Sequence, residues 1–202
     1  RDLRMSRGLG DVYKRQYLES VELRNNQVTD ISALAGKEYL YKAGFLANPL
    51  EGIEALGTCK NLRHLDLNQT GDYDGSPLAE LHKLDELNLR EGPDATAYLK
   101  GAEIGYLSVG RAGMTDVDFL RDVTFVEGLS IQQSEIFDIS ALAGRADINR
   151  INMAKCEVTD FTPLFSMPSL TWVEMSADRK EYVDAAAASL GEPHFEIVYV
   201  ED

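Results

Sequence analysis

The sequence predicts an α/β solenoid, in which short strands alternate with short helical pieces and successive units stack side by side. Three observations predict this fold. Apolar residues recur at a spacing of 22 positions through most of the 202-residue chain. Each unit contains two apolar residues two positions apart, which is typical of a short strand with one buried face. A turn and a helical pattern follow, as in "VTDISALAG" at 28–36 and "IFDISALAG" at 136–144.

The units can be followed one by one along the chain. The first four starts lie 22 positions apart, the fourth unit is 20 residues long, and the spacing of 22 then returns. Because one unit cannot bury its apolar face alone, the units must stack around a continuous core. The eight units begin at Leu18, Leu40, Leu62, Leu84, Ile104, Val126, Ile148 and Leu170.

Residues 18–34 match the pattern L-x-x-L-x-L-x-x-N-x-I-x-D-I-x-x-L almost letter for letter. On this motif the chain, from about 18 to 178, resembles the bacterial leucine-rich repeat proteins of the 22-residue class typified by internalins. The resemblance implies a curved, right-handed solenoid with a parallel sheet on the concave face and short helical or 3-10 turns on the convex face. It also implies a bacterial protein, secreted or at the cell surface, that binds a protein ligand through the concave face.

The sequence departs from the family pattern at the asparagine position. In the family a buried asparagine bonds neighbouring turns into a ladder, and only two of the eight units keep the amide. We therefore expect looser, less regular turns in the middle of the chain, above all in the short fourth unit and in the polar loop "TGDYDGSP" at 70–77. The position holds, in order, Asn26, Asn48, Thr70, Gly92, Ala112, Ser134, Cys156 and Asp178.

The last segment, 179–202, predicts a C-terminal cap after the repeats of 17–178. "SADRKEYVDAAAASLGEP" at 176–193 has the pattern of a helix that Ser176 or Asp178 caps and that Gly191 and Pro193 end. "HFEIVYV" at 194–200 alternates as a final edge strand. We expect the helix and the strand to cover the exposed end of the core and the open edge of the sheet.

The first segment, 1–16, shows no trace of the repeat. Read as codons, "DVYKRQ" at 11–16 matches the end of a transposase sequencing-library adapter, and "SRGLG" at 6–10 fits the same frame. We interpret 1–16 as a non-native, disordered tail translated from adapter DNA. The natural sequence is expected to begin near Tyr17, inside the repeat array, so that the chain is a fragment read from metagenomic DNA.

The composition is strongly acidic. The chain has 20 basic and 34 acidic side chains; without the five basic and two acidic residues of 1–16, residues 17–202 carry a net charge of −17. Such a surface repels nucleic acid and anionic lipid, and no apolar run approaches the roughly 20 residues of a membrane span. The two cysteines, Cys59 and Cys156, form neither a disulfide framework nor a metal-binding spacing. We expect a monomer with no cofactor and no nucleic-acid or membrane partner.

The candidate binding surface is the outward side of the strands. Residues that flank the buried pair of each strand face away from the core and, at a strand spacing of about 4.8 Å, form one wall of mixed charge and polarity. Tyr106 and Trp172 are its large side chains, and aromatic and arginine residues are favoured in binding hot spots. The predicted partner-binding residues are Arg24, His64, Asp66, Glu86, Arg90, Tyr106, Arg150, Trp172 and Glu174.

Two other functions are kept as alternatives to recognition. One is a structural spacer that holds another domain of a larger surface protein at a distance. The other is a hydrolase or metal site at His64, Asp66 and Glu86, because a histidine with two carboxylates can hold a metal or act as a general base. With no fourth ligand or nucleophile evident, we predict a non-catalytic protein. Cys156 is interpreted as a small core residue rather than a nucleophile.

Overall fold

A computed structural model of the chain describes residues 17–111 and 113–201. Within these residues nine strands form one parallel sheet, and each strand pairs with the next one along the chain. The adapter-like segment 1–16 and Ala112 of the asparagine series lie outside the described residues. The strands are β1 (Ser20–Glu22), β2 (Lys42–Gly44), β3 (His64–Asp66), β4 (Lys83–Asn88), β5 (Glu103–Ser108), β6 (Phe125–Ser130), β7 (Arg150–Asn152), β8 (Trp172–Ser176) and β9 (Glu196–Val200).

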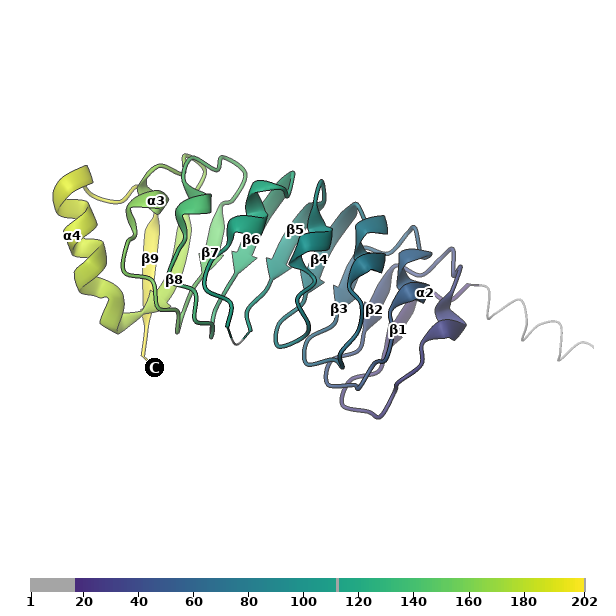
Figure 1. The fold of residues 1–202 in the computed structure, drawn as a ribbon. Coiled ribbons are helices and arrows are strands. Elements are labelled where there is room, and N and C mark those ends of the chain that lie inside the picture. The colour runs from purple at the N-terminus through teal and green to yellow at the C-terminus, as the bar shows by residue number, and fades with distance from the viewer. Residues whose placement is uncertain (1–16, 112, 202) are drawn as a thin grey trace, which may run out of the picture.

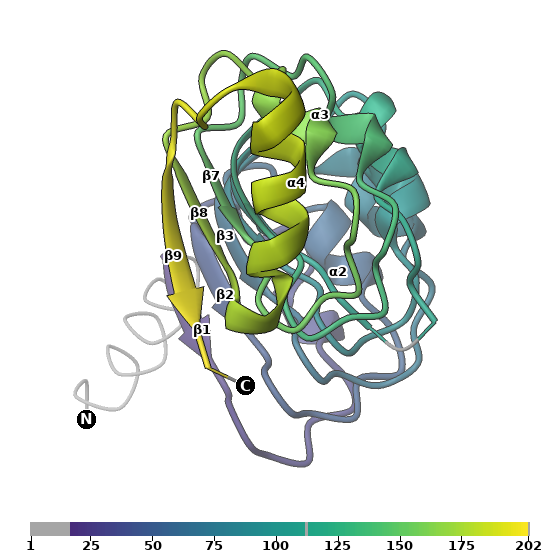
Figure 2. The same cartoon turned by 90° about the vertical axis from the view of Figure 1, so that its left-hand side faces the viewer.

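Short helical segments lie on the side of the stack opposite to the sheet. Figure 1 shows the strands side by side along the length of the molecule. Figure 2 looks along the stack, with the sheet on one side, the helical segments on the other and α4 across the C-terminal end. This architecture confirms the predicted leucine-rich repeat solenoid. The helical segments are η1 (Ser32–Leu34), α2 (Glu54–Gly57), η2 (Ser76–Glu80), η3 (Thr96–Leu99), η4 (Asp118–Arg121), η5 (Ser140–Leu142), α3 (Thr162–Phe165), η6 (Ala177–Arg179) and α4 (Lys180–Leu190).

The apolar residues of the repeats form a single core that runs through the stack. The register places the central inward residue of each strand beside that of the next, beginning with Val21, Ala43 and Leu65. The second inward position also aligns, and there Phe45 and Leu67 are fully buried. Burying a side chain of this size contributes about 1.5–3 kcal/mol, and each repeat gains most of that contribution only against its neighbours.

Six of the strands leave the sheet through the same tight turn. At each of these turns one non-glycine residue has a left-handed backbone, with φ between 52° and 59°. In five of them the amide of the turn residue donates to a carbonyl of the next repeat, as from Gln69 to Arg90 at 3.0 Å, and in the sixth Lys155 donates to the hydroxyl of Ser176. The expectation of irregular turns is therefore wrong at these positions, while the fifth unit differs, with Gly110 at a φ of 149°. The six residues are Asn25, Ala47, Gln69, Glu91, Gln133 and Lys155.

The first two residues of the asparagine series differ sharply in burial. Asn48 is 1% exposed, and its Oδ1 accepts a hydrogen bond from the N–H of Val28 at 3.1 Å. Its Nδ2 donates to the carbonyl of Phe45 at 2.9 Å and to that of Leu23. Asn26, in the first repeat, is exposed. Asn48 therefore ties two repeats together as the resemblance implies.

Smaller side chains take over this role where the amide is missing. The hydroxyl of Thr70 donates to the carbonyl of Leu67, and that of Ser134 to the carbonyl of Ile131, both at 2.6 Å. The thiol of Cys156 lies 3.1 Å from the same Ile131 carbonyl. In Thr70 and Ser134 a short donor thus satisfies the carbonyl three residues back, whereas Cys156 reaches a carbonyl of the preceding repeat. The turn at Glu91 is regular although Gly92, at the asparagine position, has no side-chain donor.

The C-terminal end of the core is covered by α4 and β9. α4 packs Val183 and Ala186 into the core, and Phe195 joins them before β9. β9 continues the sheet in parallel with β8, pairing from Trp172 with Glu196 onward. At 11 residues α4 is far shorter than a membrane span of about 20, and none of the helices in the described parts of the chain is long and apolar enough to cross a membrane.

The residues predicted to end and to begin the C-terminal helix can be compared with the observed ends of α4. Gly191 ends the helix with a φ of 95°, in agreement with its position in the sequence. The predicted cap at the start is correct in position for one of its two candidates: Ser176 is the N-cap residue of η6, which runs directly into α4, although neither element has a side-chain capping bond. Ser176 also ends β8, where its hydroxyl accepts a hydrogen bond from the N–H of Lys155 at 2.8 Å.

Replacing Asn48 with alanine should lower the free energy of unfolding by about 2–3 kcal/mol, because buried backbone groups of two repeats lose their partners. Asn26→Ala, the matched change at an exposed member of the series, should cost less than about 0.5 kcal/mol. Urea unfolding followed by circular dichroism measures both variants. Equal losses would show that the buried amide contributes nothing specific.

Replacing Ala47 with glycine should raise the free energy of unfolding by about 0.5–1 kcal/mol, because glycine adopts a φ of 56° without the steric cost of a Cβ. Ala185→Gly, on the exposed side of α4, should lower it by about 1 kcal/mol. The same urea titration compares the two. A loss of stability in Ala47→Gly contradicts the left-handed turn.

Candidate functional site

The outward side of the sheet, named the concave face from here on, carries its side chains in rows that cross the strands. The parallel register forms these rows, because it pairs equal positions of successive repeats, as His64 with Glu86 and Glu86 with Tyr106. The predicted binding residues fall into two groups along this face. Those of β1–β4 and their ends are Arg24, His64, Asp66, Glu86 and Arg90, and those of β5–β8 are Tyr106, Arg150, Trp172 and Glu174.

A further row of side chains lies one position before the predicted rows and was missed by the sequence analysis. Leu84 and Leu87 are both buried although they are three positions apart, so both Asp85 and Glu86 between them stay exposed. The L-x-x-L spacing is the signal in the sequence that could have found this row, because strict alternation cannot bury both leucines. Its members are Glu19, Tyr41, Arg63, Asp85, Gly105, Glu127, Asn149 and Thr171.

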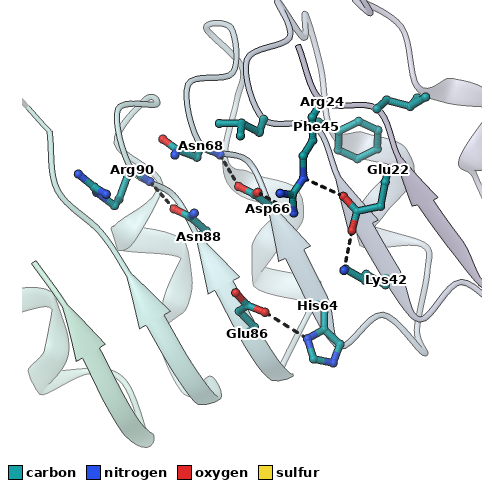
Figure 3. A network of polar contacts seen from close by, with 12 residues as sticks. Glu22, Arg24, Lys42, Phe45, His64, Asp66, Asn68, Glu86, Asn88 and Arg90 are labelled. Atoms are coloured by element: carbon teal, nitrogen blue, oxygen red, sulfur yellow. Dashed lines mark hydrogen bonds and ion pairs between the residues drawn. The ribbon is translucent and has the colours of Figure 1, made fainter. Parts of the chain in front are cut away.

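The charges at the N-terminal end of the concave face are paired with one another (Figure 3). Lys42 Nζ lies 2.7 Å from Glu22 Oε1, and Arg24 Nε lies 3.2 Å from Glu22 Oε2. Arg24 also reaches Asp66, with 3.8 Å between the guanidinium and Oδ2. The hydrogen bond from Lys42 lowers the pKa of Glu22. Arg24 is therefore engaged within the protein.

His64, Asp66 and Glu86 do not form a three-residue site. Nδ1 of His64 lies 3.4 Å from Oε2 of Glu86, and its Nε2 lies 2.9 Å from the hydroxyl of Tyr41. Asp66 turns away and accepts the N–H of Asn68 at 3.1 Å, while burial raises the pKa of its carboxyl. In residues 17–111 and 113–201 no three His, Cys, Asp or Glu side chains gather as metal ligands would. Within the described residues this arrangement gives no support to a metal site at these three side chains.

A hollow of about 650 Å³ lies in the C-terminal half of the concave face. Gly105 and Gly128 line it; a larger residue would meet the backbone at position 105 and would displace the ring of Tyr106 at position 128. A Cβ at residue 128 would lie 2.7 Å from Cδ2 of Tyr106, and one at residue 105 would lie 2.6 Å from the carbonyl oxygen of Asp85. The ring of Tyr106, which is 40% exposed, and the side chain of Arg150 border the hollow.

The polar side chains around this hollow differ in whether they have a hydrogen-bond or ion-pair partner within the protein. Glu127 Oε1 accepts a hydrogen bond from Asn149 Nδ2 at 3.2 Å, and Glu174 Oε1 accepts one from Asn152 Nδ2 at 2.8 Å. Arg150 is exposed, and its side chain makes no hydrogen bond or ion pair with any residue that the structure describes. Within the described residues the side chain of Arg150 is therefore unpaired, and it shares the hollow with the carboxylates of Asp85 and Glu127.

The two remaining predicted residues, Arg90 and Trp172, differ in their contacts with the rest of the protein. The guanidinium of Arg90 donates to Gln133 Oε1, so that its side chain is held across the upper edge of the sheet. Trp172 is half-buried and lies in the register between Arg150 and Glu196. The arrangement as a whole can hold a ligand by contact and charge.

Both cysteines belong to the core. Cys59 and Cys156 are free thiols with 0% and 2% of their surface exposed. Burial raises the pKa of both thiols, so the reactive thiolate is disfavoured. The interpretation of Cys156 as a core residue is confirmed.

Solved structures that are similar to this chain include two internalins. Internalin C2 of Listeria monocytogenes strain 4b F2365 is 26% identical, with a TM-score of 0.67, and the match covers 80% of this chain and 74% of that one. An internalin of the same strain, InlF, is 18% identical with a TM-score of 0.54, over 93% of this chain and 68% of that one, and shows the fold alone. No family model and no curated protein sequence matches the chain. The likeness supports an internalin-like leucine-rich repeat fold.

Neither native thiol should react with Ellman's reagent at neutral pH, and both should react fully in guanidinium chloride. We expect native labelling to be slower than that of an exposed thiol by more than about 100-fold, because burial disfavours the thiolate and blocks access. Ser189→Cys, on the exposed side of α4, supplies the reference thiol. Fast labelling of Cys156 in the native protein would contradict its place in the core.

Proposed function

We propose that the chain is a non-catalytic recognition module that binds a protein partner through the concave face. The observation that carries the proposal is the row formed by Tyr106, Gly128, Arg150 and Trp172 across β5–β8, with the hollow beside it. Tyrosine, tryptophan and arginine are the side chains that most often dominate binding energy. Their backbone positions are set by a continuous sheet, so little conformational entropy is lost on binding.

The fold similarity to internalins supports this proposal, together with the repeat motif that resembles the same family. The chemistry of the surface points the same way. The group at His64 is divided between Glu86, Tyr41 and a separate Asp66, and the thiols are buried. What the concave face offers is contact area and charge.

Removing the three large side chains of the row should abolish partner binding. In Tyr106→Ala/Arg150→Ala/Trp172→Ala we expect the affinity for a partner to fall by more than about 100-fold, since each hot-spot side chain contributes about 1–2 kcal/mol or more. Immobilised wild-type protein is incubated with a cell extract, and the retained proteins are identified by mass spectrometry. Each candidate partner is then titrated against both proteins in purified form.

A matched control changes three exposed side chains outside the sheet. Phe137 and Leu190 are 56% and 55% exposed, and Arg121 lies on η4. Phe137→Ala/Arg121→Ala/Leu190→Ala should keep the wild-type affinity. A partner that binds both triple variants equally well contradicts the concave face as the binding surface. If no purified candidate binds the wild type, the structural spacer is the better interpretation.

A further inference from the structure

We infer that the hollow binds a lysine side chain of the partner, with the ammonium group between the carboxylates of Asp85 and Glu127 and the aliphatic stem against the ring of Tyr106. The inference rests on the proposed function and adds the chemistry of one contact with the partner. Its ligand is a peptide segment that presents a lysine between apolar residues.

The first step is that two carboxylates flank a glycine in one row. Asp85, Gly105 and Glu127 occupy equivalent positions on β4, β5 and β6, and all three line the hollow. Two strand spacings of about 4.8 Å separate the backbones of Asp85 and Glu127 by about 10 Å. Because Gly105 has no side chain, nothing in the row stands between the two carboxylates. The end of a partner side chain can therefore enter between them.

The second step is that this gap offers hydrogen-bond acceptors that the protein leaves unused. Asp85 Oδ2 accepts the hydroxyl of Tyr41 at 3.2 Å, and Glu127 Oε1 accepts Asn149 Nδ2 at 3.2 Å. The other oxygen of each carboxylate and the side-chain oxygen of Asn149 accept no hydrogen bond from residues 17–111 or 113–201. These three oxygens match the three N–H donors of an ammonium group.

The third step is the sign of the charge in the hollow. Among the described residues that line it, the carboxylates of Asp85 and Glu127 face one cation, Arg150, which belongs to the adjacent row beside Gly128. The guanidinium lowers the affinity for a second cation, but the lining as a whole stays negative. The net charge of −17 on residues 17–202 adds a long-range attraction for a basic partner. Both terms favour lysine over a carboxylate as the occupant.

The fourth step is an aromatic wall for the stem of the lysine. A Cβ at residue 128 would lie 2.7 Å from Cδ2 and 3.3 Å from Cε2 of Tyr106, so the edge of this ring lies over Gly128. Tyr106 directly follows Gly105 on β5 and lines the same hollow. Lysine stems pack on apolar surface, and an aromatic ring also attracts a nearby cation. A small inorganic cation would make no use of this wall.

The test uses three tripeptides that differ in one side chain: acetyl-Leu-Lys-Leu-amide and its Gln and Glu counterparts. They are titrated at low ionic strength into the ¹⁵N-labelled chain, and the shifts of the Gly105 and Gly128 amides are followed by NMR. We expect saturable shifts with the Lys peptide and a dissociation constant about fivefold lower than for the Gln peptide, because exposed ion pairs are individually weak. The Glu peptide should bind more weakly than the Gln peptide. Salt at about 0.5 M should remove most of the preference for Lys.

Three variants locate the site. Asp85→Asn/Glu127→Gln should bind the Lys peptide no better than the Gln peptide, with an unchanged circular dichroism spectrum. Asp72→Asn/Glu135→Gln removes the same two charges at exposed positions outside the sheet and should keep the full preference for Lys. Arg150→Gln should bind the Lys peptide at least as tightly as the wild type does, because a repelling charge is lost.

The inference is overturned if the Lys and Gln peptides bind the wild type equally, if no peptide gives saturable shifts, or if the Glu peptide binds best. It is also overturned if both double variants lose the preference for Lys, if both keep it, or if Arg150→Gln weakens binding of the Lys peptide. A protein partner lost from the alanine triple variant without any Lys preference would leave the proposed function standing and this inference refuted. A Lys preference without any protein partner would support the lysine site and contradict the proposed function.

Discussion

Each repeat depends on the next one for half of its core and for the hydrogen bonds of its strand and turn. The amide of Leu23 donates to the carbonyl of Gly44 at 2.8 Å, and that of Asn25 to Leu46 at 2.8 Å. Because of this coupling, a repeat can change its length only in segments that do not pair in register with the neighbouring repeat. The fourth unit is two residues short, yet Leu84 still pairs with Ile104. The shortening falls between the strands, so the sheet continues unbroken across it.

The strands and the core could be predicted because apolar residues recur at a regular spacing in the sequence. Leu65, Leu87 and Leu107 occupy adjacent strands as their spacing requires. The turns could not be predicted from the asparagine series. The turn forms with a short side-chain donor at this position, as at Thr70 and Ser134, and also without one, as at Gly92. The position of Ser176 before the helical segment could be predicted, whereas the 3-10 turn η6 between Ser176 and α4 could not.

The candidate site was predictable as a surface and unpredictable as a set of contacts. Neighbours in a row lie about 4.8 Å apart, whereas residues two apart on one strand lie about 6.6 Å apart. His64 accordingly meets Glu86 and Tyr41 on other strands and leaves Asp66 aside. Such cross-strand contacts pair the charges at the N-terminal end of the concave face, whereas the side chain of Arg150 at the other end has no partner among the described residues. Composition gives no sign of it, since acidic and basic residues occur in both halves.

The hydrogen bonds between the strands run along the length of the stack, as the side-by-side strands in Figure 1 show. Tension between the two ends of the chain is thus borne by the outermost strand alone, and strands detach in succession at low force. Most detachments free the 22 residues that separate paired positions such as Ser20 and Lys42, or roughly 75 Å of extended chain. A force applied parallel to the strands instead loads many hydrogen bonds between neighbouring strands in shear at the same time. The molecule is mechanically soft along its axis and stiff across it.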